Sequence, residues 1–540
     1  MPRLLALILL LSTTALAAPR GVSRPGTVAN EDIARARAGR NGKSLFPIEP
    51  FAPAAFARAK RENRLILVDG AAAWCHWCHV MDETTYRDPA VGQILQARFV
   101  VVRFDVDERP DLGDRYESTG WPATILISPE GEELGRYRGF LDADRLKTIL
   151  EATVQSFDRS DRGTAAASGP AIVPLPVEAL GWLGRLSSLA LDGGFDEENA
   201  GWGRRKFPLP ANVLYELSQA ARGDARARDR ALRTLAAHRR LVDPVWGGIW
   251  KGNAERDWTA PHVEKQTIYQ GPNLEAFARG YAIARDPALL TAARSIEQYL
   301  ARFMTSSDGG FFAAQDADVG AHDPAERFVD GVVYYSWPDA KRRRAGLPWI
   351  DTHVYARENG LVLAGLAALY EATGDAAVLE RARRAARHLI EKTILPDGSV
   401  EHDAARATGR FFLTDAAALG LGLARLGRAA TDPAFKDAAR RIALAIDKNF
   451  ADPKTGALFD STLDPDAGGA FARRGTPLDA NLWAARLDAA VSADTGDSAF
   501  RERGLRAVAA VATPDNIDSL GYLGGELLLA LDELGVFPAK

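Results

Sequence analysis

Two cysteines that stand close together are the residues of this chain best suited to chemistry. Cys75 and Cys78 lie in the run 74–79, Trp-Cys-His-Trp-Cys-His, directly after an apolar run at residues 65–68. The chain holds no other cysteine, so neither has a second disulfide partner within it. A Cys-x-x-Cys pair can cycle between a disulfide and two thiols by thiol–disulfide exchange.

The pair is expected at the start of a helix. Unpaired backbone NH groups and the helix dipole favour a thiolate at that end of a helix. Cys78, one turn later, lies within reach of Cys75 and can close or resolve a disulfide. We therefore predict that Cys75 is the nucleophile and Cys78 the resolving thiol.

Three other interpretations of these residues stay open. Cys75-x-x-Cys78-His79 is also the attachment sequence of c-type haem, although that motif normally lies in a small helical domain. Cys75, Cys78 and His79 could instead bind zinc, with His76 as a fourth ligand. A purely structural disulfide would close a short loop and gain little stability. The prediction is no cofactor, with zinc or c-type haem at Cys75, Cys78 and His79 as alternatives.

The segments around the pair read as an α/β domain. Apolar runs predict strands, and amphipathic periods predict helices between them. A Pro-Glu-Gly turn separates the last two strands, and Asp142 caps a closing helix. The expected strands are residues 65–68, 99–106, 124–127 and 135–140.

This order of elements resembles the thioredoxin fold. Asp69 precedes Cys75 by six residues, which is the spacing of thioredoxin's buried aspartate. The resemblance implies that Asp69 exchanges a proton with Cys78; the alternative is that Asp69 only caps a turn. Pro122 matches the family's cis-proline, which faces the disulfide. Trp77 stands where oxidising members usually carry histidine, so the direction of exchange stays open.

The rest of the chain predicts a larger helical domain. Residues 157–176 are rich in Ser, Gly, Ala and Pro and read as a linker after a thioredoxin-like domain at 45–156. Beyond them, Ala- and Leu-rich amphipathic helices recur in pairs, and Gly-containing turns separate the pairs. About six such hairpins in a ring, an (α/α)6 toroid, would bury both rows of helices in residues 177–540.

The N-terminus and the charge balance set the expected environment. Residues 1–17 join a basic start, an apolar run and Ala-Leu-Ala, which predicts a signal peptide, and 18–44 read as a flexible lead-in. We therefore expect a secreted or periplasmic protein without a membrane span after cleavage. The net charge of −4 and a pI near 6.1 leave no basic face for nucleic acid.

The whole expected mature chain resembles the thioredoxin-domain proteins related to spermatogenesis-associated protein 20. In that family a thioredoxin module precedes a six-hairpin, glycosidase-like toroid. The resemblance implies this multidomain fold class, an α/β domain followed by an all-α toroid. The residues that carry it are 75–81, 105–110, 120–122, 206–208, 261–265, 316–318 and 358–360.

Ionisable residues of the second domain are expected in loops or at helix starts, at the mouth of the toroid. Such a group could bind a substrate and perform acid/base chemistry on a carbohydrate. The alternative is that these residues brace loops through ion pairs or cap helices. The candidate substrate-binding residues are His262, Glu264, Lys265, Asp316, Asp318, His353 and Glu358.

Together these features predict an exported thiol–disulfide oxidoreductase fused to a toroid of unknown ligand. Its partners would be a redox protein that supplies or accepts electrons and a glycan or protein bound by the toroid. One alternative is a carbohydrate-active toroid, an epimerase or a glycosidase, with an accessory thioredoxin module. The other is a binding scaffold without catalysis.

Overall fold

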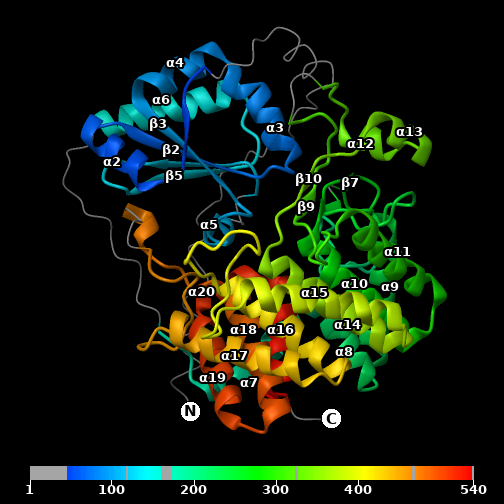
Figure 1. Ribbon diagram of the computed structural model, residues 1–540. Coiled ribbons are helices and arrows are strands. Elements are labelled where there is room, and N and C mark those ends of the chain that lie inside the picture. Colours follow the sequence, from blue (N-terminus) through cyan, green and yellow to red (C-terminus); the bar gives the residue numbers. More distant parts are fainter. Residues whose placement is uncertain are drawn as a thin grey trace.

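The computed structural model describes residues 45–116, 120–159, 173–253, 255–322, 326–464 and 469–537. An α/β domain lies against one end of a ring of helices (Figure 1). The predicted signal peptide at 1–17 and lead-in at 18–44 lie outside the described residues, as does most of the predicted linker. The structure confirms the predicted fold class, a thioredoxin-like α/β domain followed by an all-α toroid.

The α/β domain is built on a five-stranded sheet in the order β1-β3-β2-β4-β5. The first three strands in the chain are parallel, and β4 runs antiparallel to both β2 and β5. Side chains of β2 and β4 are buried throughout, whereas β5 alternates between half-buried and exposed, as an edge strand does. The strands are β1 Ile48–Pro50, β2 Leu65–Ala71, β3 Phe99–Asp105, β4 Ala123–Ile127 and β5 Glu133–Arg138.

Helices cover both faces of this sheet. Because side chains alternate along a strand, Leu65 and Leu67 face a core with α4 and α6, while Ile66 and Val68 face the core that contains the cysteines. Helix α6 continues to Arg159, past the predicted domain boundary at residue 156. The helices are α2 Pro53–Glu62, α3 His76–Glu83, α4 Pro89–Arg98, α5 Pro110–Tyr116 and α6 Ala143–Arg159.

The second domain is a closed ring of helix pairs. Six inner helices pack in the cyclic order α8, α10, α14, α16, α18 and α21, and α21 returns to α8. The inner helices are α8 Pro210–Ala221, α10 Thr267–Ala284, α14 Ala356–Thr373, α16 Leu413–Ala429, α18 Leu478–Thr495 and α21 Gly525–Glu533. Their outer partners, in the same order, are α9 Ala225–His238, α11 Pro287–Phe303, α15 Ala376–Thr393, α17 Pro433–Phe450, α19 Ser498–Val511 and α7 Leu180–Gly193.

Local sequence explains both rows. Five outer helices begin after an aspartate whose side chain accepts a backbone NH of the first turn, which caps the helix. Inner helices approach one another where glycine removes the side chain. A Cβ atom at Gly360 of α14 would stand 2.4 Å from the backbone of Ala418, and one at Gly422 of α16 would stand 2.1 Å from the Gly360 carbonyl oxygen.

Short strands and helices form the rim of the ring that faces the α/β domain (Figure 1). Ala314 and Phe471, both from the second domain, belong to the same buried cluster as Cys75 and Cys78. The rim elements are β6 Gly252–Asn253, β7 Pro261–His262, β8 Lys265–Gln266, β9 Ala314–Gln315, α12 Gly331–Tyr335, α13 Asp339–Ala345 and β10 Ile350–Asp351. Among the described helices, none is both long and apolar enough to cross a membrane.

Candidate active site at the domain interface

The two cysteines form a disulfide at the start of α3. Cys75 is the N-cap residue, and its Sγ accepts a hydrogen bond from the backbone NH of Cys78 at 3.2 Å. This position supplies the backbone donors and the helix dipole that stabilise a thiolate. Each cysteine is 4% exposed, so the disulfide is buried in the assembled chain.

A cis-proline lies at the same end of the central strands as the disulfide loop. The Trp121–Pro122 peptide bond is cis, as the resemblance to thioredoxin implied. Ala123 of β4 pairs with Gly70 of β2 in antiparallel register. Because β2 leads into the loop before Cys75, the register brings Pro122 to the end of the sheet that carries this loop.

Asp69 lies within β2, is 1% exposed and does not cap a turn. Its Oδ2 accepts a hydrogen bond from Arg103 Nε at 2.7 Å, while Oδ1 is buried without a hydrogen-bond partner among the described residues. Burial raises the pKa of Asp69, and the Arg103 guanidinium opposes part of that rise. A carboxyl group with a raised pKa and a free oxygen is suited to proton exchange.

His76, between the two cysteines, pairs with the toroid. Its Nδ1 lies 2.8 Å from Asp318 Oδ2, and the other oxygen of Asp318 accepts the Gly331 NH at 2.8 Å. Burial works against the imidazolium, but the hydrogen bond and charge of Asp318 raise the pKa of His76 to about 9. At neutral pH a positive charge is therefore held next to Cys75.

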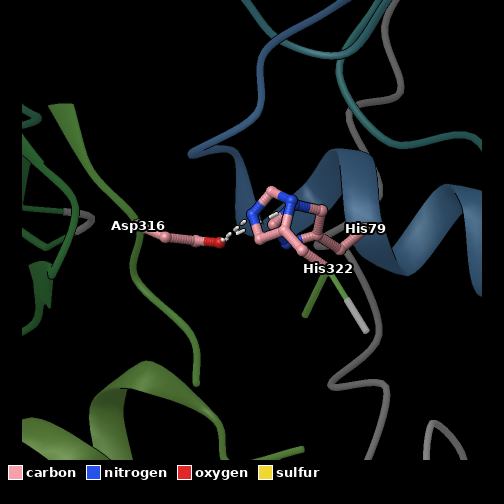
Figure 2. Close-up of side chains that lie close together, drawn as sticks. All are labelled: His79, Asp316 and His322. Atoms are coloured by element: carbon pink, nitrogen blue, oxygen red, sulfur yellow. Dashed lines mark hydrogen bonds and ion pairs between the residues drawn. The ribbon is translucent and has the colours of Figure 1, made fainter. Parts of the chain in front are cut away.

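His79 faces a second carboxylate of the toroid. Its Nε2 lies 3.0 Å from the Ala73 carbonyl oxygen and 3.9 Å from Asp316 Oδ2. The same oxygen of Asp316 lies 2.8 Å from His322 Nε2. Figure 2 shows the Asp316 carboxylate directed at the two imidazoles, one from α3 and one from a rim loop. His322 packs on Trp349, with ring centroids 4.5 Å apart.

Trp74 and Asp107, both of the thioredoxin-like domain, together contact the toroid. Trp74 Nε1 donates to Asp107 Oδ2 at 2.6 Å, and Lys251 Nζ lies 4.5 Å from the Trp74 ring centroid. The backbone oxygen of Asp107 lies 2.7 Å from Nε2 of His402, whose Nδ1 lies 2.8 Å from Asp415. Burial, with the charges of Asp105 and Glu358, raises the pKa of Asp107 to about 7.

Glu358 and His353 lie near this contact. Glu358 is 3% exposed and accepts from Arg357 Nε at 2.8 Å, and its Oε2 has no hydrogen-bond partner among the described residues. His353 Nδ1 lies 2.5 Å from Asp351 Oδ1, and this bond, against burial, raises the pKa of His353 to about 9. The His353 ring stacks on Tyr355 at 5.2 Å.

The predicted cluster at 262–265 divides into two environments. His262 is half-buried in β7, and burial lowers its pKa against the attraction of Glu264. Lys265 is fully buried and donates to Asp243 and to the Gly247 carbonyl, both at 2.7 Å. The contacts of Lys265 are those of the bracing alternative.

The predicted toroid residues therefore do not form one group at the mouth of the ring. Asp316 and Asp318 meet the cysteine motif, His353 and Glu358 lie toward Asp107, and Lys265 braces the rim below. Sequence reasoning missed partners that contribute to the site. They are Arg103, Asp107, Lys251, His322, Arg357, His402 and Asp415.

Histidine usage is a signal that could have identified some of these partners. The chain has eight histidines, and six of them lie at the interface: His76, His79, His262, His322, His353 and His402. Because histidine is rare in this chain, the presence of six histidines beside the cysteines and in the rim loops indicates that these segments form one site.

Comparisons with known proteins agree with this architecture. Residues 46–162 match the family model described as Thioredox_DsbH, protein of unknown function, DUF255. Human spermatogenesis-associated protein 20 (Homo sapiens) is 28% identical over 322 residues, which are 53% of this chain and 41% of that protein. The chain carries a thioredoxin-like DUF255 domain and is homologous to spermatogenesis-associated protein 20. The match spans about two fifths of the length of these curated relatives.

Two further similarities cover different shares of the chain. The thiol:disulfide interchange protein DsbD 1 of Pseudomonas aeruginosa is 35% identical over 103 residues, 18% of this chain and 17% of that protein. A crystal structure of a D-mannose isomerase aligns with a TM-score of 0.49 at 10% identity, and the alignment covers 66% of this chain and 96% of that chain.

Proposed function

We propose that this protein is a thiol–disulfide oxidoreductase whose substrate meets Cys75 at the rim of the toroid. The observation that carries the proposal is the setting of Cys75. It caps α3, receives the Cys78 NH, and has the cationic His76 beside it, held by Asp318. Each feature favours the thiolate, which is the reactive form in exchange.

In the reducing direction, the Cys75 thiolate attacks one sulfur of a substrate disulfide. A mixed disulfide forms, and one substrate thiolate leaves. Cys78, once deprotonated, attacks Cys75 Sγ, which closes the Cys75–Cys78 disulfide and releases the second substrate thiolate. Two electrons pass from the pair to the substrate, and a dithiol of a redox partner protein restores the pair. The reverse sequence oxidises a substrate.

Asp69 is the proposed acid/base for this exchange. Its buried Oδ1 is free to take the Cys78 proton, and its raised pKa makes it able to return that proton. Arg103 orients the carboxyl group through Oδ2. Asp318 acts as a positioning residue, because it reaches the thiols only through His76.

Burial of the disulfide restricts the substrate. With both cysteines 4% exposed, a folded protein surface cannot reach Cys75 in this arrangement. An extended segment or a small disulfide can enter, or the two domains can move apart. The toroid rim would select what reaches the thiols.

One relative and one prediction from the sequence support the setting of this function. The name of DsbD 1 describes thiol:disulfide interchange, and that protein is similar to this chain over 103 residues. The predicted signal peptide at 1–17 would deliver the protein to the periplasm or the exterior, where disulfides persist.

A carbohydrate-active toroid is the second candidate. It is favoured by two carboxyl groups at the domain interface. Burial and the charges of Asp105 and Glu358 raise the pKa of Asp107, from the thioredoxin-like domain, to about 7, and Glu358 Oε2, from the toroid, has no hydrogen-bond partner among the described residues. Such a pair is suited to acid/base chemistry on a sugar. Glu358→Gln would abolish that activity and leave thiol exchange intact.

Trapping tests the primary proposal. Cys78→Ser should accumulate a mixed disulfide with a disulfide-containing peptide, because the resolving thiol is absent. Cys75→Ser should neither form that adduct nor catalyse exchange. Adducts that form equally in Cys75→Ser, or a wild-type pair that does not exchange with the peptide, would overturn the proposal.

The reduction potential of the pair then gives the direction. A value near that of thioredoxin, about −270 mV, indicates a reductant, and a value near about −120 mV indicates an oxidant.

A further inference from the structure

We propose that His79, Asp316 and His322 bind a divalent transition-metal ion between the two domains. This inference is separate from thiol exchange, because it needs neither cysteine as a ligand. His79 comes from α3 of the thioredoxin-like domain, and Asp316 and His322 come from one loop of the toroid rim (Figure 2). The donor atoms of the three residues all lie within 4.8 Å of one another.

The spacing of the donors suits a small ion. Zinc binds nitrogen and oxygen ligands at about 2.0–2.1 Å, so the donors of a tetrahedral site stand about 3.3 Å apart. Asp316 Oδ2 lies 2.8 Å from His322 Nε2 and 3.9 Å from His79 Nε2. The Ala73 carbonyl oxygen, 3.0 Å from His79 Nε2, is available as a fourth donor. These distances fall on either side of the ideal value, and side-chain shifts of about half an ångström satisfy it.

The protons of His79 give the second argument. If Nε2 carries the proton and donates to Ala73, then Nδ1 presents a lone pair to Asp318 Oδ2 at 3.6 Å and has no hydrogen-bond donor. If Nδ1 carries the proton, the Nε2 lone pair faces the Ala73 oxygen at 3.0 Å. In each neutral tautomer, therefore, the lone pair of one ring nitrogen faces the lone pair of an oxygen. A cation at Nε2, shared with Ala73 and Asp316, removes the conflict. A doubly protonated ring also removes it, and the charges of Asp316 and Asp318 favour that form because, against burial, they raise the pKa of His79.

The chemistry of the donors narrows the choice of ion. Imidazole nitrogens favour zinc and its neighbours, whereas magnesium and calcium prefer sites made only of oxygen. His322 is a third exposed and lies at the solvent side of the cluster, so an ion can enter and can keep a water ligand. Asp316 Oδ1 accepts the Asp318 NH at 3.1 Å, which orients Oδ2 toward both rings.

The donor atoms of a neighbouring group, His76, Asp318 and Asp330, also lie within 4.8 Å of one another, but one of its carboxylates already has a structural role. Asp330 caps α12 through the NH groups of Val332 and Val333. We therefore assign the ion to the His79 group and an ion pair to the His76 group.

An ion at this position would tie the two domains together next to the disulfide. His79 belongs to the thioredoxin-like domain and Asp316 to the toroid, and their side chains meet at the domain interface. Bound metal would thus hold the rim against α3 and keep the cysteines covered.

Zinc titration of the full-length, tag-free protein tests the site. The protein is kept in its disulfide form, verified by the absence of thiol labelling, so that thiolates cannot bind the metal. Calorimetry should show one Zn²⁺ per chain, and Co²⁺ should give a visible spectrum of nitrogen and oxygen ligands without a thiolate band. His322→Ala should lower the affinity at least about tenfold. Because His322 is an exposed residue, this variant should fold normally.

The matched control is His388→Ala, which removes a histidine from outer helix α15 and should bind Zn²⁺ as the wild type does. Asp316→Asn keeps the shape of the side chain but weakens its ligand oxygen. Its affinity for Zn²⁺ should lie between the affinities of the wild type and His322→Ala. A disulfide-form protein that binds no Zn²⁺ would overturn the proposal in favour of a doubly protonated His79. Binding that is equal in the wild type and His322→Ala would overturn it as well.

Discussion

Two clusters of buried charge lie on the same rim, and they differ in how completely their atoms are paired. In the first, which we call the bracing cluster, Asp243 lies between Lys265 and Arg342, and every polar atom of the two cations has a partner within the toroid. The second is the interface cluster of His76, His79, Asp316, Asp318 and His322. Its two α3 histidines contact toroid carboxylates across the interface, and His79 Nδ1 has no hydrogen bond to any described residue.

The difference shows which buried charges have spare capacity. Fully paired charges specify one arrangement and have nothing to offer a ligand. Histidines carry protons and lone pairs that a change of pH or a ligand can exchange. We therefore interpret the bracing cluster as structural and the interface cluster as functional. The predictions below test that division, from the largest expected effect to the smallest.

The bracing cluster should dominate stability. Asp243→Ala leaves Lys265 and Arg342 buried without their shared carboxylate, and we expect the free energy of unfolding to fall by about 3–5 kcal/mol. Urea denaturation followed by far-UV circular dichroism measures this change. Asp229→Ala, which removes an exposed carboxylate paired with Arg233, should change stability by less than about 0.5 kcal/mol. A loss below about 1 kcal/mol for Asp243→Ala would contradict the structural role.

Two histidines, one fully buried and one half-buried, should respond to pH with opposite sign. His238 is fully buried against Trp258 and has no hydrogen-bond partner in the part of the chain that the structure describes, and burial lowers its pKa from 6.5 to about 3. Below pH 6.5 the unfolded chain binds a proton that the folded protein does not, so stability falls as the pH decreases. His76 has a pKa raised to about 9, so its contribution is present below pH 6.5 and is lost as the pH rises through 9.

We expect His238 alone to destabilise the protein by about 2 kcal/mol at pH 5 relative to pH 7, at about 1.4 kcal/mol per pKa unit. His238→Leu should remove this part of the acid dependence. Denaturation at both pH values measures the difference for wild type and variant. If the two proteins lose the same stability between pH 7 and 5, His238 is not neutral and buried in solution.

The contrast between the clusters also explains what sequence could predict. The cysteine pair, Asp69, Pro122 and the order of strands are local patterns, because periodicity and short spacings specify them. The helix pairs of the toroid follow from the same periodicity. The pairing of His76 with Asp318 joins residues 242 positions apart, and no local pattern reveals it.

Roles were harder to predict than positions. Lys265 and Asp316 both stood in motifs rich in ionisable residues, and only their partners distinguish a brace from a site. His322 and His402 belong to no motif, so sequence reasoning passed over them. They enter the site because the fold brings their loops to the cysteine-bearing domain.

The smallest expected effect concerns the thiols themselves. Asp318→Asn removes the carboxylate that keeps His76 charged, so the positive charge beside Cys75 should be lost near neutral pH. We expect the pKa of Cys75 in the reduced protein to rise by about one unit, which corresponds to about 1.4 kcal/mol. The pH dependence of alkylation rate, measured with a chelator present, reports this pKa without a contribution from bound metal. Asp351→Asn, which removes the partner of His353 at the same rim, should leave it unchanged. If Asp318→Asn leaves the alkylation profile of Cys75 unaltered, the interface cluster does not lower the pKa of the thiol. The interpretation of that cluster as functional would then be wrong.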